Sequence, residues 1–114
     1  MYEYVCKLSR VVDGDTVIID VDLGFTVHVN VGFRLLGINA PEVVGVTHKD
    51  GLAAKQHLST LLGQGTIVVK SLKPLKTDKY GRWLGTFYVT KPDGSVVNVN
   101  DQMVVDGFAV VYVP

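Results

Sequence analysis

The stretch FTVHVNVGFRL (residues 25–35) has the clearest structural pattern in the chain. Every odd position from Phe25 to Leu35 is apolar, and polar residues or glycine fall between them. Because successive side chains of a β-strand point to opposite faces, this alternation predicts a strand with one buried face, and Arg34 on the other. The residues expected in the core of a closed barrel are Val27, Val29, Val31 and Phe33.

The flanking sequence predicts further strands and two helices. Residues 2–12 and 17–22 have strand patterns on either side of the tight-turn signal Asp13-Gly14. From about Asp50 the apolar residues recur with a helical period, which ends at a glycine in the position of a C-terminal cap. The remaining predictions are strands over 66–72, 83–90 and 108–113, and a short helix that opens on a capping pair at 98 and 101 and ends at 107.

This order of elements predicts a mainly β (α+β) fold. Mostly antiparallel strands with one main helix inserted, and a short second helix, fit the five-stranded oligonucleotide/oligosaccharide-binding (OB) barrel. A length of 114 residues is enough for one domain with its own core, so we expect a single domain over 1–114.

Composition limits the classes of function. The chain is 47% hydrophobic and 19% charged, as soluble globular proteins are. There is no signal-peptide pattern after Met1 and no apolar run long enough to span a membrane, which favours an intracellular protein without a membrane partner. Cys6 has no second cysteine with which to pair, and its strand setting favours a small buried side chain. Because the formal net charge is zero, any nucleic-acid binding must come from a local basic patch.

Three polar clusters carry the candidate chemistry. They are DGDT (13–16), the stretch from Arg34 to Glu42, and KTDKYGR (76–82). Two arginines, a glutamate and oxygen ligands for a hard metal are the parts that a phosphodiester-cleaving site needs, so we expect the clusters to converge. The alternative is that these are surface residues in ordinary ion pairs, and that the lysines of residues 70–82 form a solvated basic loop. His28 and His57 are expected to be solvated or structural.

Taken in this order, the three clusters resemble the staphylococcal nuclease (thermonuclease) family. The likeness covers nearly the whole chain, including the helix after Pro41-Glu42 and the ending from Val97 to Tyr112. The resemblance implies an OB barrel and a calcium-dependent nuclease, a hydrolase that cuts DNA and RNA with little sequence preference.

Carried over position by position, the resemblance implies a role for each residue. The metal ligands would be Asp15, Asn39 and the backbone carbonyl of Ala40. The catalytic residues would be Arg34 and Arg82, which hold the phosphate, and Glu42, which acts as general base or positions the attacking water. The substrate-binding residues would be Lys79, Tyr80 and Tyr112.

Two departures from the family pattern qualify these expectations. Asn39 stands where the family has a second aspartate, so we expect a weak Ca²⁺ site, or a site for another divalent cation, that nucleotide strengthens and Asn39→Asp tightens. The family prototype continues into a further helix where this sequence closes at Pro114, which predicts a surface for a partner or a second copy in a homodimer. The alternative to a nuclease is therefore a non-catalytic OB module that binds nucleic acid or a protein segment.

Overall fold

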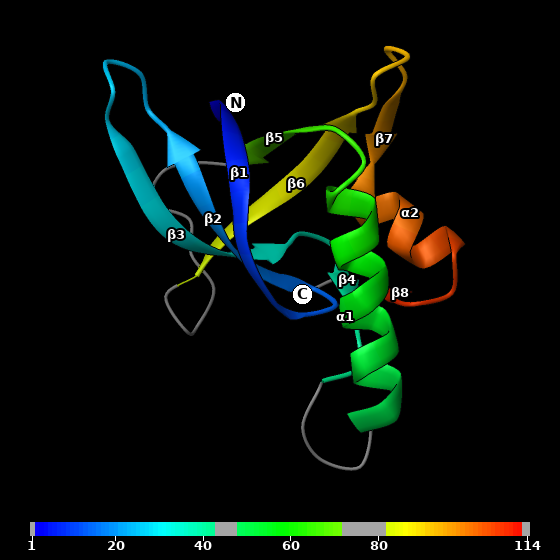
Figure 1. The fold of residues 1–114 in the computed structure, drawn as a ribbon. Coiled ribbons are helices and arrows are strands. Elements are labelled where there is room, and N and C mark those ends of the chain that lie inside the picture. The colour runs from blue at the N-terminus through cyan, green and yellow to red at the C-terminus, as the bar shows by residue number, and fades with distance from the viewer. Residues whose placement is uncertain (1, 43–47, 72–81, 113–114) are drawn as a thin grey trace.

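The computed structural model describes residues 2–42, 48–71 and 82–112. The strands are β1 (Tyr2–Asp13), β2 (Thr16–Asp22), β3 (His28–Leu35), β4 (Ile38–Asn39), β5 (Thr66–Ser71), β6 (Trp83–Thr90), β7 (Val96–Asn98) and β8 (Val110–Val111). The helices are α1 (His48–Leu62) and α2 (Val99–Val105). Figure 1 shows the strands curling around one another, with both helices packed at one side.

Five of the strands form a closed barrel. β1 pairs with β2 and β5, β2 pairs with β3, and β5 pairs with β6, all antiparallel. The ring closes where Phe33, Arg34 and Leu35 of β3 run parallel to the first residues of β6. The OB-like α+β fold is thereby confirmed, and the closing pair brings Arg34 next to the start of β6.

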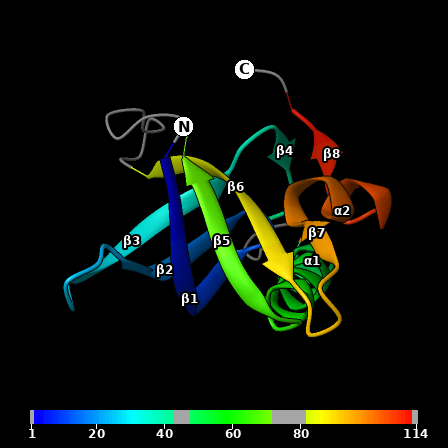
Figure 2. The same ribbon diagram turned by 90° about the horizontal axis from the view of Figure 1, so that it is seen from above.

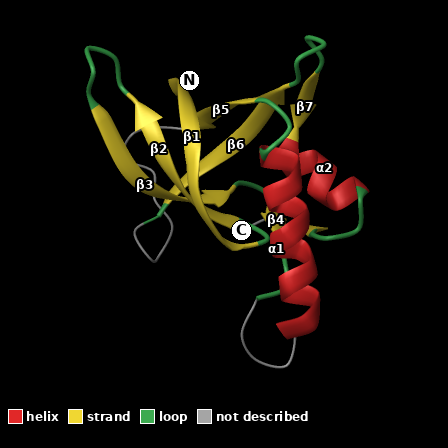
Figure 3. Ribbon diagram, viewed as in Figure 1, coloured by secondary structure: helices red, strands yellow, loops and turns green. Residues whose placement is uncertain are grey.

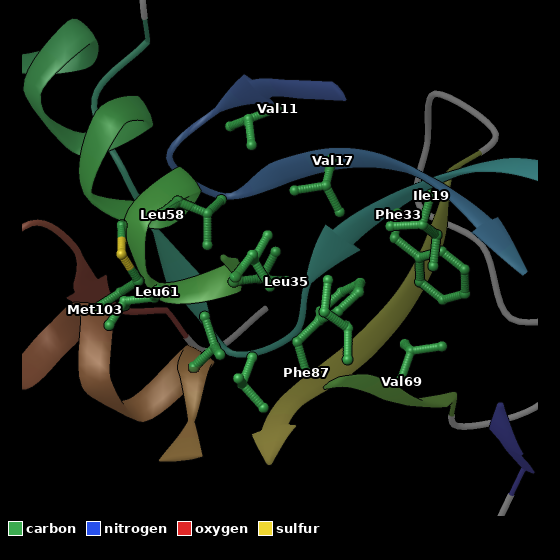
Figure 4. Close-up of a cluster of buried hydrophobic side chains, with 14 of the residues drawn as sticks. Val11, Val17, Ile19, Phe33, Leu35, Leu58, Leu61, Val69, Phe87 and Met103 are labelled. Atoms are coloured by element: carbon green, nitrogen blue, oxygen red, sulfur yellow. The ribbon is translucent and has the colours of Figure 1, made fainter. Parts of the chain in front are cut away.

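The core fills the barrel and the space under the helices. Figure 4 shows strand residues such as Val17 and Phe87 packed together, with Leu58 and Leu61 of α1 and Met103 of α2 beside them. The ring of Phe33 meets the ring of Phe87 edge-on, with centroids 5.7 Å apart. Aromatic pairs favour this geometry, so the contact adds to the stability of the barrel beyond the area that it buries.

The prediction for the inner face of the third strand was partly wrong. Phe33 is buried and Val31 is half-buried, but Val27 and Val29 are 52% and 41% exposed. Only the last three residues of β3 have a partner in β6, so the β2–β3 hairpin extends past the wall that closes the barrel (Figure 1). Val29 and Val31 instead line an open apolar cleft of about 280 Å³.

The helices begin and end close to where the sequence predicts. Asn98 is the N-cap of α2, and its side chain accepts a hydrogen bond from the backbone N–H of Asp101. Figure 3 shows α1 and α2 side by side. His57 of α1 joins them, because its Nε2 lies 2.6 Å from Asp106 Oδ2 and its ring stacks on Phe108. This role is structural, as expected.

Two short strands were missed. β7 extends the sheet beside β6, and β4 pairs with β8 in a small second sheet. Figure 2 shows β4 and β8 next to each other, close to α2. The last strand is shorter than predicted, but its pairing holds the C-terminal segment against the turn that follows β3. Among the residues that the structure describes, neither helix has the length and apolar sequence needed to cross a membrane.

Candidate functional site

The carboxylate of Asp15 is buried at the turn between β1 and β2. Its Oδ1 accepts a hydrogen bond from the Thr16 hydroxyl, and its Oδ2 accepts one from the backbone N–H of Ala40, both at 2.9 Å. Gly14 allows this close approach, since a Cβ there would lie 2.6 Å from Ala54 Cβ and 2.9 Å from Ala40 Cβ. The Asp15 carboxylate is therefore held in one orientation by Thr16 and by the backbone of Ala40, which follows β4.

Arg34 reaches from β3 across both predicted metal-ligand side chains. Its Nη2 donates to Asn39 Oδ1 at 2.9 Å and lies 3.5 Å from Asp15 Oδ2. Its Nη1 donates a longer hydrogen bond to the backbone carbonyl of Ile38, at 3.4 Å. The guanidinium group thus contacts both the β1–β2 turn and β4.

Arg82 enters the same region from the start of β6. It immediately precedes Trp83, which pairs with Phe33, the residue before Arg34. Its Nη1 donates to the Thr16 hydroxyl at 3.2 Å. Thr16 therefore accepts from Arg82 and donates to Asp15, and it couples the second arginine to the buried carboxylate. This role of Thr16 was not predicted from the sequence.

Tyr112 lies at the edge of this group. Its backbone N–H donates to the carbonyl of Gly37 at 2.8 Å, which fixes the chain next to the β3–β4 turn. The Arg34 Cζ atom is 5.5 Å from the centre of the Tyr112 ring, within the range of a cation–π contact. Tyr112 as a whole is 46% exposed.

The structure thus brings together six of the predicted site residues: Asp15, Arg34, Asn39, Ala40, Arg82 and Tyr112. Glu42 is exposed and lies two residues after Ala40 along the chain. Lys79 and Tyr80 lie outside the described residues, as does most of the predicted basic loop.

The predicted metal ligands are all oxygen donors. The predicted ligands are the Asp15 carboxylate, the Asn39 carboxamide oxygen and the Ala40 backbone carbonyl, and oxygen ligands of these kinds suit Ca²⁺. A carboxylate has about four acceptor sites, and Asp15 uses one on Oδ1 for Thr16 and two on Oδ2, for Ala40 and, at 3.5 Å, for Arg34. Within the described residues no group of three or more His, Cys, Asp or Glu side chains could hold a metal ion. The residues fit a weak oxygen site that water and a ligand would complete.

Asn100 is a second residue that the sequence analysis missed. It is buried on α2, accepts a hydrogen bond from the N–H of Phe87, and donates to the carbonyls of Leu36 and Gly85. These bonds tie the helix to β6 and to the turn that leads to Asn39. The signal in the sequence is a carboxamide between Val99 and Met103, on the apolar side of a short helix.

Cys6 is the one cysteine of the chain, and none of its described contacts is to the residues of the candidate site. Cys6 is buried in β1, and its Sγ donates a weak bond to the carbonyl of Ile67. Burial, with a smaller effect of the Asp20 charge, raises the pKa of the Cys6 thiol to about 12. The thiol therefore stays protonated at neutral pH, which agrees with the predicted structural role.

A family model described as staphylococcal nuclease homologue matches residues 32–114. The chain belongs to this family. The matched range includes Arg34, Asn39, Glu42 and Arg82, whereas Asp15 precedes it.

A similarity to one archaeal protein extends further along the chain. The uncharacterized protein MJ1439 of Methanocaldococcus jannaschii is 30% identical over an alignment of 130 residues. The alignment covers 96% of this chain. The chain spans about 60% of the length of that relative. The match includes the N-terminal strands of this nuclease homologue, and so the segment around Asp15.

Proposed function

We propose that this nuclease homologue hydrolyses phosphodiester bonds of DNA, RNA or both, with little sequence preference and with help from a divalent cation. The observation that supports the proposal most strongly is the link through Thr16. Its hydroxyl joins the carboxylate of Asp15 to the guanidinium of Arg82, and Arg34 contacts the other oxygen of the same carboxylate. Three distant segments supply these groups, and membership of the staphylococcal nuclease family supports a role for them in nuclease chemistry.

The two arginines would bind and stabilise the reacting phosphate. In-line attack at phosphorus spreads negative charge over the equatorial oxygens, so positioning and charge stabilisation supply most of the catalysis. A planar guanidinium matches two phosphate oxygens at once, which an ammonium group does not. Arg34 lies on β3 and Arg82 directly precedes β6, and their guanidinium groups contact the neighbouring side chains of Asp15 and Thr16.

Glu42 would take the proton from the attacking water. The side chain is exposed and follows Ala40, whose N–H anchors Asp15. A general base must come within hydrogen-bond reach of the proton that it abstracts, and Glu42 would meet this requirement from its place two residues after Ala40, the hydrogen-bond partner of Asp15. Tyr112, next to Arg34, would contact a base or sugar flanking the bound phosphate.

A divalent cation would be held by Asp15, Asn39 and the carbonyl of Ala40. When bound, such a cation polarises a phosphoryl oxygen and so favours attack at phosphorus. The buried hydrogen bonds to Thr16 and Ala40 keep the Asp15 carboxylate oriented for this purpose. Ca²⁺ is our first choice because all the donors are oxygens.

The second candidate function is a binding module without catalysis, and Asn39 is the observation that favours it. A carboxamide gives the cation a dipole where a carboxylate would give a charge, which weakens metal binding. Nucleic acid could still bind to the two arginines. The two functions therefore differ in whether a bound strand is cut.

A cleavage and binding assay separates the candidates. The purified chain is incubated with end-labelled single-stranded DNA, duplex DNA and RNA, in Ca²⁺, Mg²⁺, Mn²⁺ or EDTA, and binding is followed by fluorescence anisotropy. The nuclease predicts cleavage with a divalent cation and none in EDTA. Arg82→Lys, purified in the same way, controls for a contaminating nuclease and should lose the activity. Binding without cleavage under all conditions would favour the module, and neither binding nor cleavage would contradict both.

A further inference from the structure

Arg34 donates to the same oxygen atoms that a cation would use. The Nη2 atom bonds to Asn39 Oδ1 at 2.9 Å and lies 3.5 Å from Asp15 Oδ2. The side chains of Arg34 and Asp15 are only 17% and 9% exposed, so water screens this positive charge less than it would at an open surface. The guanidinium therefore has the contacts, the charge and the burial of a bound cation.

We propose that Arg34 is a built-in cation, which fills the predicted metal site until an anionic ligand draws it away. The inference rests on the proposed function, because it concerns the phosphate and the cation of that reaction. On this proposal the two ligands bind in a fixed order, the phosphate before the divalent cation. A phosphate that engages Arg34 would release the oxygens of Asn39 and Asp15, and a divalent cation would then bind to them.

The carboxamide of Asn39 strengthens the competition between Arg34 and a cation, because it has only one acceptor oxygen. An aspartate has two acceptor oxygens, so one can accept from an arginine while the other binds a metal. Asn39 has a single acceptor oxygen, because its second terminal atom is an NH₂ donor. Arg34 has no acceptor atom, so the oxygen of Asn39 must be the atom that faces it. Arginine and cation therefore compete for one oxygen.

Phosphate is a better partner for a guanidinium group than a carboxamide is. A phosphate can accept two parallel N–H bonds from Arg34 and carries a full charge, whereas Asn39 accepts one bond and carries none. Coupling between two sites is reciprocal, so a cation bound at Asp15 must in turn tighten phosphate binding by the same factor.

An alternative is that the contact only braces the β3–β4 turn. Arg34 also donates to the carbonyl of Ile38, which is consistent with such a role. The two accounts predict opposite signs. If Arg34 braces the turn, its removal disorders the oxygens and weakens metal binding. If Arg34 is a competing cation, its removal tightens metal binding in the free protein.

The test is calorimetric Ca²⁺ titration of the native chain and Arg34→Met without nucleotide. Methionine keeps an unbranched apolar stem and removes the charge. We expect Arg34→Met to bind Ca²⁺ at least about fivefold more tightly, the lower end of typical coupling factors. Arg10→Met, which removes an exposed arginine of β1, is the matched control and should leave the affinity near the native value. Equal or weaker binding by Arg34→Met would overturn the proposal.

Two further experiments distinguish occupancy of the Asn39 oxygen by Arg34 from simple repulsion between the charges of Arg34 and Ca²⁺. At about 1 M salt, where the Debye length is about 3 Å, long-range repulsion is screened but occupancy of the oxygen persists. The difference between native and Arg34→Met should therefore remain. In Asn39→Asp, which offers a second oxygen, the further change Arg34→Met should have a much smaller effect. An equal effect in both backgrounds would contradict competition for one oxygen.

A final arm uses the native chain, so it does not depend on the folding of a variant. Saturating nucleoside 3′,5′-bisphosphate should tighten Ca²⁺ binding to the native chain, and should do so less in Arg34→Met. No gain in the native chain would overturn the proposal even if the chain cleaves DNA. A tighter Arg34→Met site in a chain that never cleaves would instead support the competing cation and refute the nuclease.

Discussion

The Asp15 carboxylate accepts a hydrogen bond from the backbone N–H of Ala40, at 2.9 Å. The two residues are 25 positions apart, and this contact joins the β1–β2 turn to the β3–β4 segment. Because both groups are buried, the bond fixes the direction of the carboxylate before any ligand arrives. Preorganised groups of this kind need little rearrangement during a reaction.

Asp15→Ala should destabilise the fold as well as abolish metal binding. The substitution leaves the Ala40 N–H and the Thr16 hydroxyl without their acceptor, and a buried unsatisfied donor costs about 1–3 kcal/mol. Urea denaturation should register this loss in the free energy of unfolding. Asp15→Asn, which keeps an acceptor oxygen, should retain more of the stability but still lose Ca²⁺ binding. Equal stability of native chain and Asp15→Ala would contradict the anchoring role.

Arg34→Lys and Arg82→Lys should reduce cleavage far more than they reduce stability. Lysine keeps the charge but loses the planar fork that matches two phosphate oxygens. We expect a fall in kcat of about 100-fold or more, as for removal of one donor to a transition state. Arg10→Lys on the exposed face of β1 is the control. A variant with native kcat would mean that its arginine does not hold the reacting phosphate.

Asn100→Ala should be strongly destabilising. The Phe87 N–H and the carbonyls of Leu36 and Gly85 would lose a buried partner, and the expected loss is about 2–4 kcal/mol of unfolding free energy. Asn98→Ala on the same helix removes only the N-cap bond and should cost about 1 kcal/mol. If the two variants unfold at the same urea concentration, Asn100 does not tie α2 to the turn.

The contact between the helices should make stability pH-dependent through Asp106. Hydrogen bonds from His57, and then from Gln102, hold the pKa of the Asp106 carboxyl below its ordinary value of 3.8. A carboxyl whose pKa is lower in the folded state contributes stability above its unfolded pKa, and this contribution disappears as pH falls through the folded pKa. Asp106→Asn should therefore destabilise the chain at pH 5–7, with the difference shrinking below pH 3.8. A difference that is constant with pH would contradict the assignment.

Local patterns in the sequence predicted most of the elements. β6 begins at Trp83 and ends at Thr90 as expected, and α1 follows the helical period of its apolar residues. Such features depend on neighbours in the chain. The exposure of Val27 and Val29 depends instead on how far β3 extends beyond its pairing with β6, which residue alternation does not encode.

The residue types of the candidate site could be predicted from local sequence motifs, but the contacts between distant segments could not. Its residue types stand in three recognisable motifs, so Asp15, Arg34 and Arg82 could be named in advance. The roles of Thr16 and Asn100 depend on hydrogen bonds between segments that are 66 and 15 residues apart. The contact between Arg34 and Asn39 likewise depends on the conformation of the β3–β4 turn, which motif matching does not supply.

The most direct test of the proposed site is the single-turnover cleavage rate of Glu42→Gln, measured on single-stranded DNA with Ca²⁺. Glutamine keeps the shape of the side chain but cannot accept a proton, so the rate should fall about 100-fold or more, the usual contribution of a general base. The affinity for the uncut strand should stay near the native value, and Glu3→Gln on β1 should cleave normally. A Glu42→Gln chain that cuts as fast as the native protein would contradict the account.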